Sequence, residues 1–258
     1  MDVRLDGRAA LITGGSKGLG AAMARRFAEA GADVAILARG REALAATERA
    51  IRQASQVRVL AIPSDVSKAA DIASAWAKAT GEFGKVDILV NNAGTSRTGA
   101  FETITDELWQ EDFDLKLFAA IRLARLALPG MKERRWGRII NVLNIGAKAP
   151  RPGSAPTAVS RAAGLALTKV LAGEGAPHNV LVNSLHVGLI RSNQHEERVL
   201  KEGGDVEASY RERGKAVPLG RFGDAGEFAN IACFLASDAA SYITGTSINV
   251  DGGMSPVV

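Results

Sequence analysis

A glycine-rich turn near the N-terminus has the residue types needed to hold a pyrophosphate. The run Thr13-Gly14-Gly15-Ser16-Lys17-Gly18-Leu19-Gly20 follows an apolar segment and precedes an Ala-rich segment of helical period. Glycines let the backbone approach phosphate groups, and a helix start supplies free N–H groups with a positive dipole. Because a strand comes before the turn and a helix after it, we predict dinucleotide contacts here. The expected contact residues are Gly14, Ser16, Lys17, Gly18, Leu19 and Gly20.

The end of the next apolar run, residues 33–38, bears on the choice of cofactor. A carboxylate at this position would bind the ribose hydroxyls of NAD and repel the extra phosphate of NADP. The chain instead has Ala38-Arg39, with no acid at the tip. Arg39 and Lys17 are two cations that can flank a 2′-phosphate. The sequence therefore favours NADP(H) over NAD(H), although solvated side chains at a loop tip would look the same.

Two further polar groups follow later apolar runs and are expected at the same edge of a parallel sheet. Asp65 and Val66 come after the third run, where a carboxylate can meet an adenine amino group. Asn92, Ala93 and Gly94 come after the fourth run. Ligands of open α/β sheets bind at the carboxyl ends of the strands, so we assign all five to the cofactor site.

The elements that must position these residues alternate along the chain. Short apolar or β-branched runs are separated by six helical connections, which is typical of a parallel sheet covered on both faces. We predict an α/β fold: one Rossmann-like, doubly wound domain over residues 1–258, with a seven-stranded parallel sheet flanked by helices. The expected strands are residues 9–13, 33–38, 57–62, 86–90, 137–143, 179–185 and 246–250.

Composition excludes several classes of protein. The 258 residues include 32 Lys plus Arg against 28 Asp plus Glu and are 47% hydrophobic, which suits a globular core. The longest uncharged stretch, 175–190, is too short and too polar for a membrane helix, and the N-terminus lacks a signal core, so we expect a cytoplasmic protein. Cys233 is the only cysteine, which excludes an internal disulfide and a Cys-rich metal site; we predict no metal. Cations interleaved with acids argue against a nucleic-acid partner.

Two regions interrupt the alternation. Residues 95–105 read as a polar loop after the fourth strand. Residues 189–222 are charged and too long for a plain connection. We predict a mobile substrate lid there, with a solvated surface insertion as the alternative.

The order and spacing of several motifs give a family resemblance over essentially the whole chain. TGGSKGLG, then DV, NNAG, GRIINV and the C-terminal LGRFGDAGEFANIACFLASDAASYITGTSINVDGG resemble the short-chain dehydrogenase/reductase family. The resemblance implies a nicotinamide cofactor, a small-molecule substrate and a homodimer or homotetramer. The expected subunit contacts are helices around residues 108–129 and 155–172.

The same resemblance locates a catalytic end in which every usual residue is replaced. The family's chemistry uses Asn, Ser and a Tyr-x-x-x-Lys pair, in which Tyr carries the proton and Lys holds the nicotinamide ribose. Here Lys116 stands at the Asn position, Asn144 at the Ser position, Thr157 at the Tyr position and Arg161 at the Lys position. An alkyl hydroxyl does not ionise near pH 7, and Arg161 keeps its proton while still able to bind ribose hydroxyls. We therefore expect altered acid–base machinery.

Lys116 offers a replacement for the missing acid. Burial beside Arg161 would lower the pKa of its ammonium and make it a proton carrier or a Schiff-base amine. The alternative is a solvated lysine on the far side of its helix. Asn144 retains an oxygen-binding amide.

A second candidate follows the sixth strand, where the family usually has Pro-Gly and then Thr against the nicotinamide. This chain has His186-Val187-Gly188-Leu189 and then Ser192. The resemblance implies cofactor contacts from Val187, Gly188, Leu189 and Ser192. We add His186 as a titratable catalytic candidate, against the alternative of a packed core histidine, and count His195 and Tyr210 as candidates that only lid closure would bring near.

The leading function is an NADP-dependent oxidoreductase acting on a small carbonyl or alcohol with the non-standard catalytic residues Lys116, Asn144, Thr157, Arg161 and His186. One alternative is a lyase or isomerase on an anionic keto substrate, using Lys116 and Arg161 with no acid nearby. The other is a non-catalytic NADP-binding protein.

Overall fold

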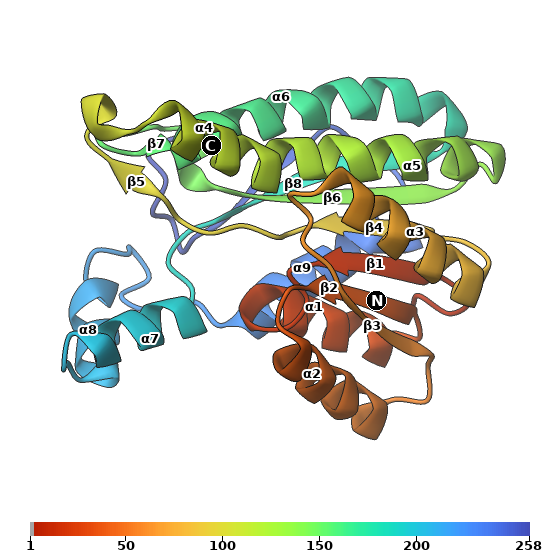
Figure 1. The fold of residues 1–258 in the computed structure, drawn as a ribbon, viewed down its shortest axis with the longest axis horizontal. Helices are drawn as coiled ribbons and strands as arrows, with labels where there is room; N and C mark the ends of the chain where they lie inside the picture. The colour runs from red at the N-terminus through yellow and green to blue at the C-terminus, as the bar shows by residue number, and fades with distance from the viewer. Residues whose placement is uncertain (1–2) are drawn as a thin grey trace.

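A seven-stranded parallel sheet forms the centre of the molecule. The computed structural model describes residues 3–258, apart from the side chains of residues 193–195. The strand order is β3-β2-β1-β4-β6-β8-β9, all in parallel register (Figure 1). The strands are β1 (Ala9–Thr13), β2 (Asp33–Ala38), β3 (Val59–Pro63), β4 (Ile88–Asn91), β6 (Gly137–Asn144), β8 (Val180–Val187) and β9 (Ser247–Val250).

Helices cover both faces of this sheet, because strands buried on both sides have no polar face to expose. One apolar core lies between the sheet and α1 (Gly18–Glu29), α2 (Arg41–Ala54) and α9 (Ala225–Ala236). A second lies between the sheet and α3 (Ala69–Phe83), α5 (Ala119–Glu133) and α6 (Thr157–Gly175), and Figure 1 shows the two layers on opposite sides. The predicted doubly wound α/β fold is confirmed.

The connection from β4 to α5 is more structured than the polar loop expected at 95–105. It contains β5 (Thr98–Gly99), which pairs antiparallel with β7 (Ala155–Pro156), and a 3-10 turn at Phe101–Thr103. Next, α4 (Asp106–Phe113) runs through a π-helical turn, Asp114–Phe118, into α5. Turns of this kind are frequent at functional sites because they displace side chains from helical register.

The charged region 189–222 forms two helices, α7 (Asn193–Lys201) and α8 (Val206–Gly214), which stand apart from the layers at the lower left of Figure 1. The pair has its own small core. Tyr210 is buried, and its ring meets that of Phe222 edge to face with centroids 4.9 Å apart. Arg191 forms an ion pair with Glu207 at 2.6 Å, which fixes α8 to the segment that leaves β8.

Two further observations concern the described part of the chain. None of its helices is both long enough and apolar enough to cross a membrane. Cys233 is fully buried in α9, as its apolar surroundings in the sequence predict.

Candidate active site

The candidate site lies at the carboxyl ends of β1 and β4, where the strand order reverses. Ligands of open α/β sheets bind in a crevice outside this point, so we call this end of the sheet the crevice. Thr13 joins the two strand ends: its Oγ1 accepts hydrogen bonds from the backbone N–H groups of Asn92 and Ala93, both at 2.9 Å. The Asn92 side chain donates back to the Thr13 carbonyl oxygen at 2.9 Å. The Gly-rich turn and residues 92–94 therefore form one cradle.

The glycines of the turn are required by its shape. Gly14 and Gly18 have φ of 66° and 53°, in the left-handed region that favours glycine. A Cβ on Gly20 would overlap the Gly14 carbonyl oxygen and lie 2.7 Å from Asn92 Nδ2. No side chain caps the start of α1 at Lys17, so the first-turn N–H groups face the crevice without a side-chain partner. A bare helix start beneath a tight glycine turn fits a pyrophosphate.

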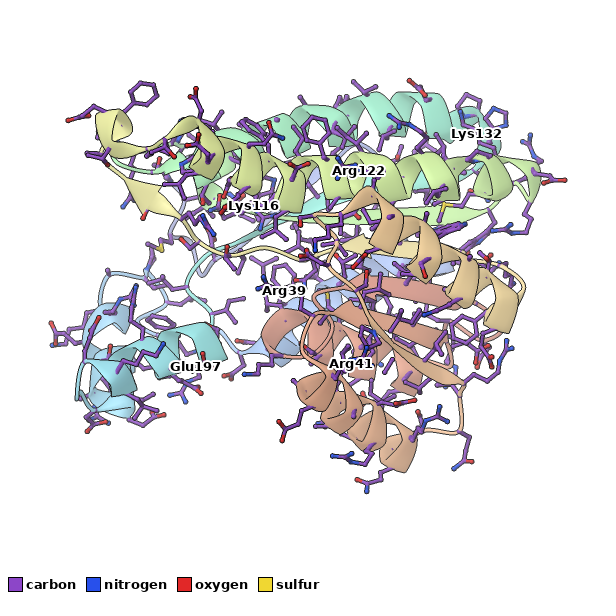
Figure 2. The ribbon with its side chains drawn as sticks, in the orientation of Figure 1. Arg39, Arg41, Lys116, Arg122, Lys132 and Glu197 are labelled. Carbon is purple, nitrogen blue, oxygen red and sulfur yellow. The ribbon has the colours of Figure 1, made fainter. Side chains whose placement is uncertain are left out.

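The cations expected to flank a 2′-phosphate lie at the same end of the molecule. Arg39 is exposed at the tip of β2, and Figure 2 shows it on the side where α7 lies, while Lys132 is at the opposite end. Lys17 Nζ, however, forms an ion pair with Glu197 of α7 at 3.1 Å. The sequence did not predict this contact, which joins the Gly-rich turn to the charged insertion.

Asp65 and Val66 follow β3 as expected, with Val66 buried and Asp65 half-buried. Burial opposes ionisation of the Asp65 carboxyl, but hydrogen bonds from the side chain and backbone of Ser67 outweigh it and hold its pKa below the usual value. Arg39 contributes in the same direction. Asp65 is therefore an ionised acceptor at neutral pH.

Lys116 is a buried cation rather than a solvated one. Its side chain is 1% exposed. The ammonium forms an ion pair with Asp112 and donates to Thr157 Oγ1 at 2.8 Å. The expectation that Lys116 and Arg161 have no nearby acid is wrong, because Asp112 contacts Lys116 directly.

Asp112 is the site residue that sequence reasoning missed. Its side chain is also 1% exposed, and its second oxygen accepts from Ser160 Oγ of α6 at 2.6 Å. The signal was present, since Asp112 and Lys116 are four residues apart and such pairs share a helix face. What the spacing could not show is that α6 covers this face and removes it from water.

Thr157 ties three elements together through its hydroxyl group. Oγ1 accepts from Lys116 Nζ and, at 3.0 Å, from the backbone N–H of Arg97. The hydroxyl donates to the Arg97 carbonyl oxygen at 2.7 Å. A hydroxyl has one proton and two lone pairs, so every position is used. Thr157 thus anchors the segment before β5 to the start of α6.

Arg161 lies one helical turn from Thr157 and reaches the end of the sheet. Its guanidinium donates to the Val142 carbonyl oxygen at 2.7 Å, while its buried Nε has no hydrogen-bond partner in the described structure. Gly94 passes so close to this guanidinium that an added Cβ would overlap Nη2 and lie 3.6 Å from Lys116 Cγ. Lys116, Arg161 and Gly94 are therefore brought together. The Oδ1 atom of Asn144, at the end of β6, is likewise buried and unpartnered among the described residues.

Burial sets the charge behaviour of the two cations. Desolvation lowers the pKa of Lys116 to about 8; Asp112 opposes this effect, whereas Arg161 and Arg97 add to it. Desolvation also lowers the pKa of Arg161 to about 10, with Asp112 opposing. At neutral pH both stay cationic, but Lys116 can release a proton within one or two pH units.

His186 does not join this cluster. It is fully buried on β8, between β6 and β9. Its Nδ1 donates to the Asn144 carbonyl oxygen at 2.9 Å, and Nε2 lies 2.9 Å from Ser247 Oγ and 3.1 Å from Ser184 Oγ. Desolvation lowers its pKa to about 4, so the ring is neutral. The geometry does not support the predicted catalytic role; His186 is a packed core histidine.

The end of β8 and the segment after it pack against Asp251. Gly188 is required there, because a Cβ would lie 2.5 Å from Asp251 Cβ, and Val187 and Leu189 flank it half-buried. The backbone N–H of Ser192 donates to the Tyr210 hydroxyl at 3.1 Å. Tyr210 thus links α8 to Ser192 at the start of the insertion. The side chain of His195 lies outside the described residues.

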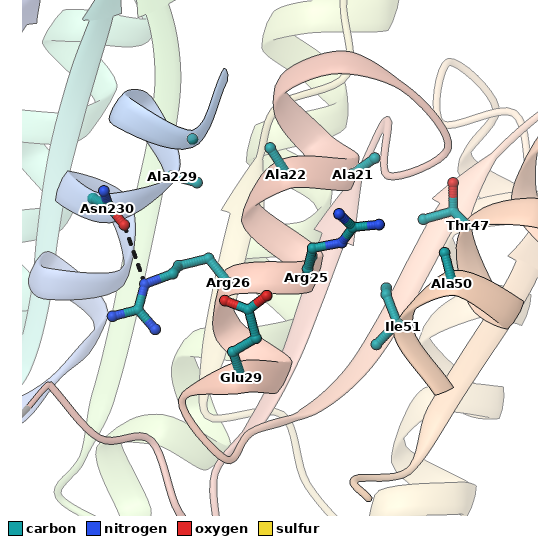
Figure 3. A pocket seen from close by; sticks show the side chains of 11 residues that line it. Ala21, Ala22, Arg25, Arg26, Glu29, Thr47, Ala50, Ile51, Ala229 and Asn230 are labelled. Atoms are coloured by element: carbon teal, nitrogen blue, oxygen red, sulfur yellow. Dashed lines mark hydrogen bonds between the residues drawn. The ribbon is translucent and has the colours of Figure 1, made fainter. Parts of the chain in front are cut away.

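A separate pocket lies between the outer surfaces of α1, α2 and α9 (Figure 3). Arg26 Nε donates to Asn230 Oδ1 across it at 3.1 Å. None of the predicted site residues lines this pocket. We therefore place the site at the crevice and not at this pocket.

The chain is similar to known proteins over nearly its whole length. The family described as enoyl-(acyl carrier protein) reductase matches residues 14–255. The chain is 34% identical to a 3-oxoacyl-[acyl-carrier-protein] reductase of Aquifex aeolicus, over 98% of this chain and all of that protein. It is 38% identical to a D-beta-hydroxybutyrate dehydrogenase of Cupriavidus necator, over 96% of this chain and 98% of that protein. The structure of L-sorbose reductase from Gluconobacter frateurii, complexed with NADPH and L-sorbose, superposes with a TM-score of 0.95 at 35% identity, and all of both chains is covered.

Proposed function

Because the chain belongs to the short-chain dehydrogenase/reductase family, we propose that it is an NADP(H)-dependent oxidoreductase that interconverts a small carbonyl compound and its alcohol. The observation that carries the proposal is the cofactor cradle. The turn from Gly14 to Gly20, the uncapped start of α1 and the Thr13 bridge to residues 92–94 are all in place.

The preference for NADP(H) is supported by charge. Arg39 stands where a carboxylate would select NAD, and Lys17 lies in the turn itself. Both are exposed and can reach a 2′-phosphate. The sorbose reductase that superposes on this chain binds NADPH.

At the catalytic end, Thr157 and Lys116 are proposed to move the proton. Bound NADPH supplies the hydride. The Thr157 hydroxyl turns from the Arg97 carbonyl toward the substrate oxygen and gives up its proton, and Lys116 gives a proton to Thr157 Oγ1 in the same step. The steps must be concerted because an alkoxide on Thr157 is too basic to persist near pH 7. Lys116 is left neutral and regains its proton through Thr157 Oγ1 from water that enters after the product leaves.

Arg161 and Asn144 are assigned to binding. The Arg161 guanidinium is fixed at the sheet edge by Val142, where its remaining N–H groups can meet ribose hydroxyls. The buried Oδ1 atom of Asn144 can accept a hydrogen bond from a hydroxyl or amide group of the substrate. A Schiff-base lyase is not supported, because Lys116 Nζ is enclosed and already paired. The relatives named above are redox enzymes, which does not favour a non-catalytic protein.

The proposal is tested by titrating the purified protein with NADPH and NADH separately, followed by a screen of small ketones, hydroxyketones and keto acids. We expect micromolar NADPH affinity and much weaker NADH affinity. Arg39→Ala should weaken NADPH and leave NADH unchanged, whereas Arg49→Ala, an exposed arginine farther along α2, should affect neither. Failure of both cofactors to bind at millimolar concentration would remove the proposal.

Three further features are proposed with this function. The whole chain acts as one domain, and residues 189–222 act as a substrate lid that stands beside the cradle. The exposed apolar side chains of Leu126 on α5 and Val170 on α6 support a homodimer or homotetramer. Light scattering at several concentrations gives the assembly state. A cytoplasmic location stays a prediction.

A further inference from the structure

We propose that Asp112 is a positioning residue: its buried carboxylate holds the Lys116 ammonium charged and directed at Thr157 Oγ1. This inference rests on the proposed function, because it assigns a purpose to the proton that Lys116 delivers. No residue with this task belongs to the four positions at which the resemblance locates catalysis.

The geometry of the ion pair carries the argument. Both side chains are 1% exposed, and each oxygen of Asp112 has its own donor, Lys116 Nζ on one and Ser160 Oγ on the other. The carboxylate therefore cannot rotate without breaking a hydrogen bond. Lys116 in turn reaches Thr157 Oγ1 at 2.8 Å. A lysine has several rotatable bonds, so a fixed counter-ion is what gives the ammonium one direction.

Charge balance supports the same conclusion. Lys116 is surrounded by Asp112 from α4, by Arg161 from α6 and by Arg97 from the segment before β5. Burial and the two arginines disfavour the ammonium, and Asp112 is the group that opposes them. Without this carboxylate, a lysine enclosed by two arginines would be neutral at physiological pH and would have no proton to give.

The π-helical turn at Asp114–Phe118 explains how the pair is placed. The turn begins two residues after Asp112 and contains Lys116, whose ammonium lies on the face that α6 covers. Thr157 and Ser160 both lie on the first turn of α6 and meet the pair there. The Lys116 ammonium is thus bound by Asp112 of α4 and by Thr157 of α6.

The test combines a direct titration with a rate profile. NMR of protein labelled with [ε-13C]lysine reports the pKa of Lys116 without substrate or cofactor, with the signal assigned by its loss in Lys116→Gln. We expect a midpoint near the wild-type pKa of about 8, moved to acid by about 1–3 pH units in Asp112→Asn. The alkaline limb of kcat for carbonyl reduction should move with it. Asp114→Asn is the matched control, because Asp114 is a partly exposed carboxylate of the same helical segment that pairs with Arg122. It should change neither the Lys116 midpoint nor the alkaline limb of kcat.

Two further variants separate positioning from packing. Asp112→Glu keeps the negative charge, so the alkaline limb of kcat should stay near its wild-type pH. If Asp112 served only to fill space, Asp112→Glu should impair the enzyme as much as Asp112→Asn does. If Asp112→Asn does not fold, Ser160→Ala releases the second oxygen of Asp112 without removing a buried charge. A folded Ser160→Ala protein with lowered kcat and unchanged NADPH affinity supports the inference.

An unchanged Lys116 midpoint in Asp112→Asn overturns the inference, as does a folded Ser160→Ala protein with the wild-type kcat. These outcomes leave the proposed function standing if NADPH still binds and the wild type still turns over. If the wild-type protein does not bind NADPH, the proposed function is wrong, and the NMR titration still decides whether Asp112 keeps Lys116 charged.

Discussion

Lys116 Nζ donates a hydrogen bond of 2.8 Å to Thr157 Oγ1, and so connects the two positions at which the family resemblance expects Asn and Tyr. In the family pattern the ionisable group is the one at the tyrosine position. Here the ionisable group has moved to the other position, and the hydroxyl between it and the crevice belongs to a threonine. The replacements therefore read as one coupled change rather than four separate losses.

The Thr157 hydroxyl should be required for turnover but not for cofactor binding. Thr157→Val keeps the shape of the side chain and removes the group that receives a proton from Lys116. We expect kcat to fall by about 10²–10⁴, the range for a lost proton-transfer group, with NADPH affinity unchanged. Thr157→Ser retains the hydroxyl and should recover most of the rate. Equal activity in the Val and wild-type proteins would show that another group carries the proton.

Parts of this site follow from the sequence and parts do not. The strands and the Gly14–Gly20 turn are encoded locally, in apolar runs and in glycines that the backbone needs, so they can be predicted. The contacts of Thr157 with Arg97 join segments 60 residues apart. The choice between the two interpretations of His186 could not be made from sequence for the same reason, since only the neighbours β6 and β9 show that its ring is enclosed. Asp112 was within reach, because its spacing from Lys116 is a local pattern.

His186 should make the protein less stable in acid. Its pKa is lowered by burial to about 4, below the ordinary value of 6.5. The unfolded chain therefore takes up a proton first as the pH falls, so stability present above pH 6.5 is lost as the pH falls toward 4. Between pH 7 and 5 this contributes about 2 kcal/mol to the fall in unfolding free energy.

Urea unfolding at the two pH values measures this contribution. His186→Asn should reduce the difference between pH 7 and pH 5 by about that amount, even though the variant is less stable at both. His178→Asn, at the partly exposed turn before β8, is the control and should leave the difference as in the wild type. An unaltered difference in His186→Asn would assign the acid sensitivity to other groups.

Gly20 should be essential for the cofactor because of its closeness to the turn. A Cβ there overlaps the Gly14 carbonyl oxygen and crowds Asn92 Nδ2, so Gly20→Ala must open the cradle. We expect at least about a tenfold loss of NADPH affinity by fluorescence titration, equivalent to about 1.4 kcal/mol. Gly81→Ala lies on α3 where no atom is within 4 Å, and should leave affinity unchanged while stabilising the helix slightly. Normal NADPH binding by Gly20→Ala would mean that the pyrophosphate is held elsewhere.

Glu197 should weaken NADPH binding in the wild type, because its carboxylate forms an ion pair with the Lys17 ammonium and so competes with the 2′-phosphate for it. Both side chains are more than half exposed, and exposed ion pairs contribute less than about 1 kcal/mol, so the effect is limited to about fivefold. Glu197→Gln should tighten NADPH binding by about two- to fivefold and leave NADH binding unchanged. Glu202→Gln, just beyond the end of α7, is the control. In a Lys17→Met background the Glu197 substitution should have no further effect on NADPH, since the contested ammonium is gone. Equal tightening of NADH would show that α7 acts on the entry of both cofactors and not on the phosphate.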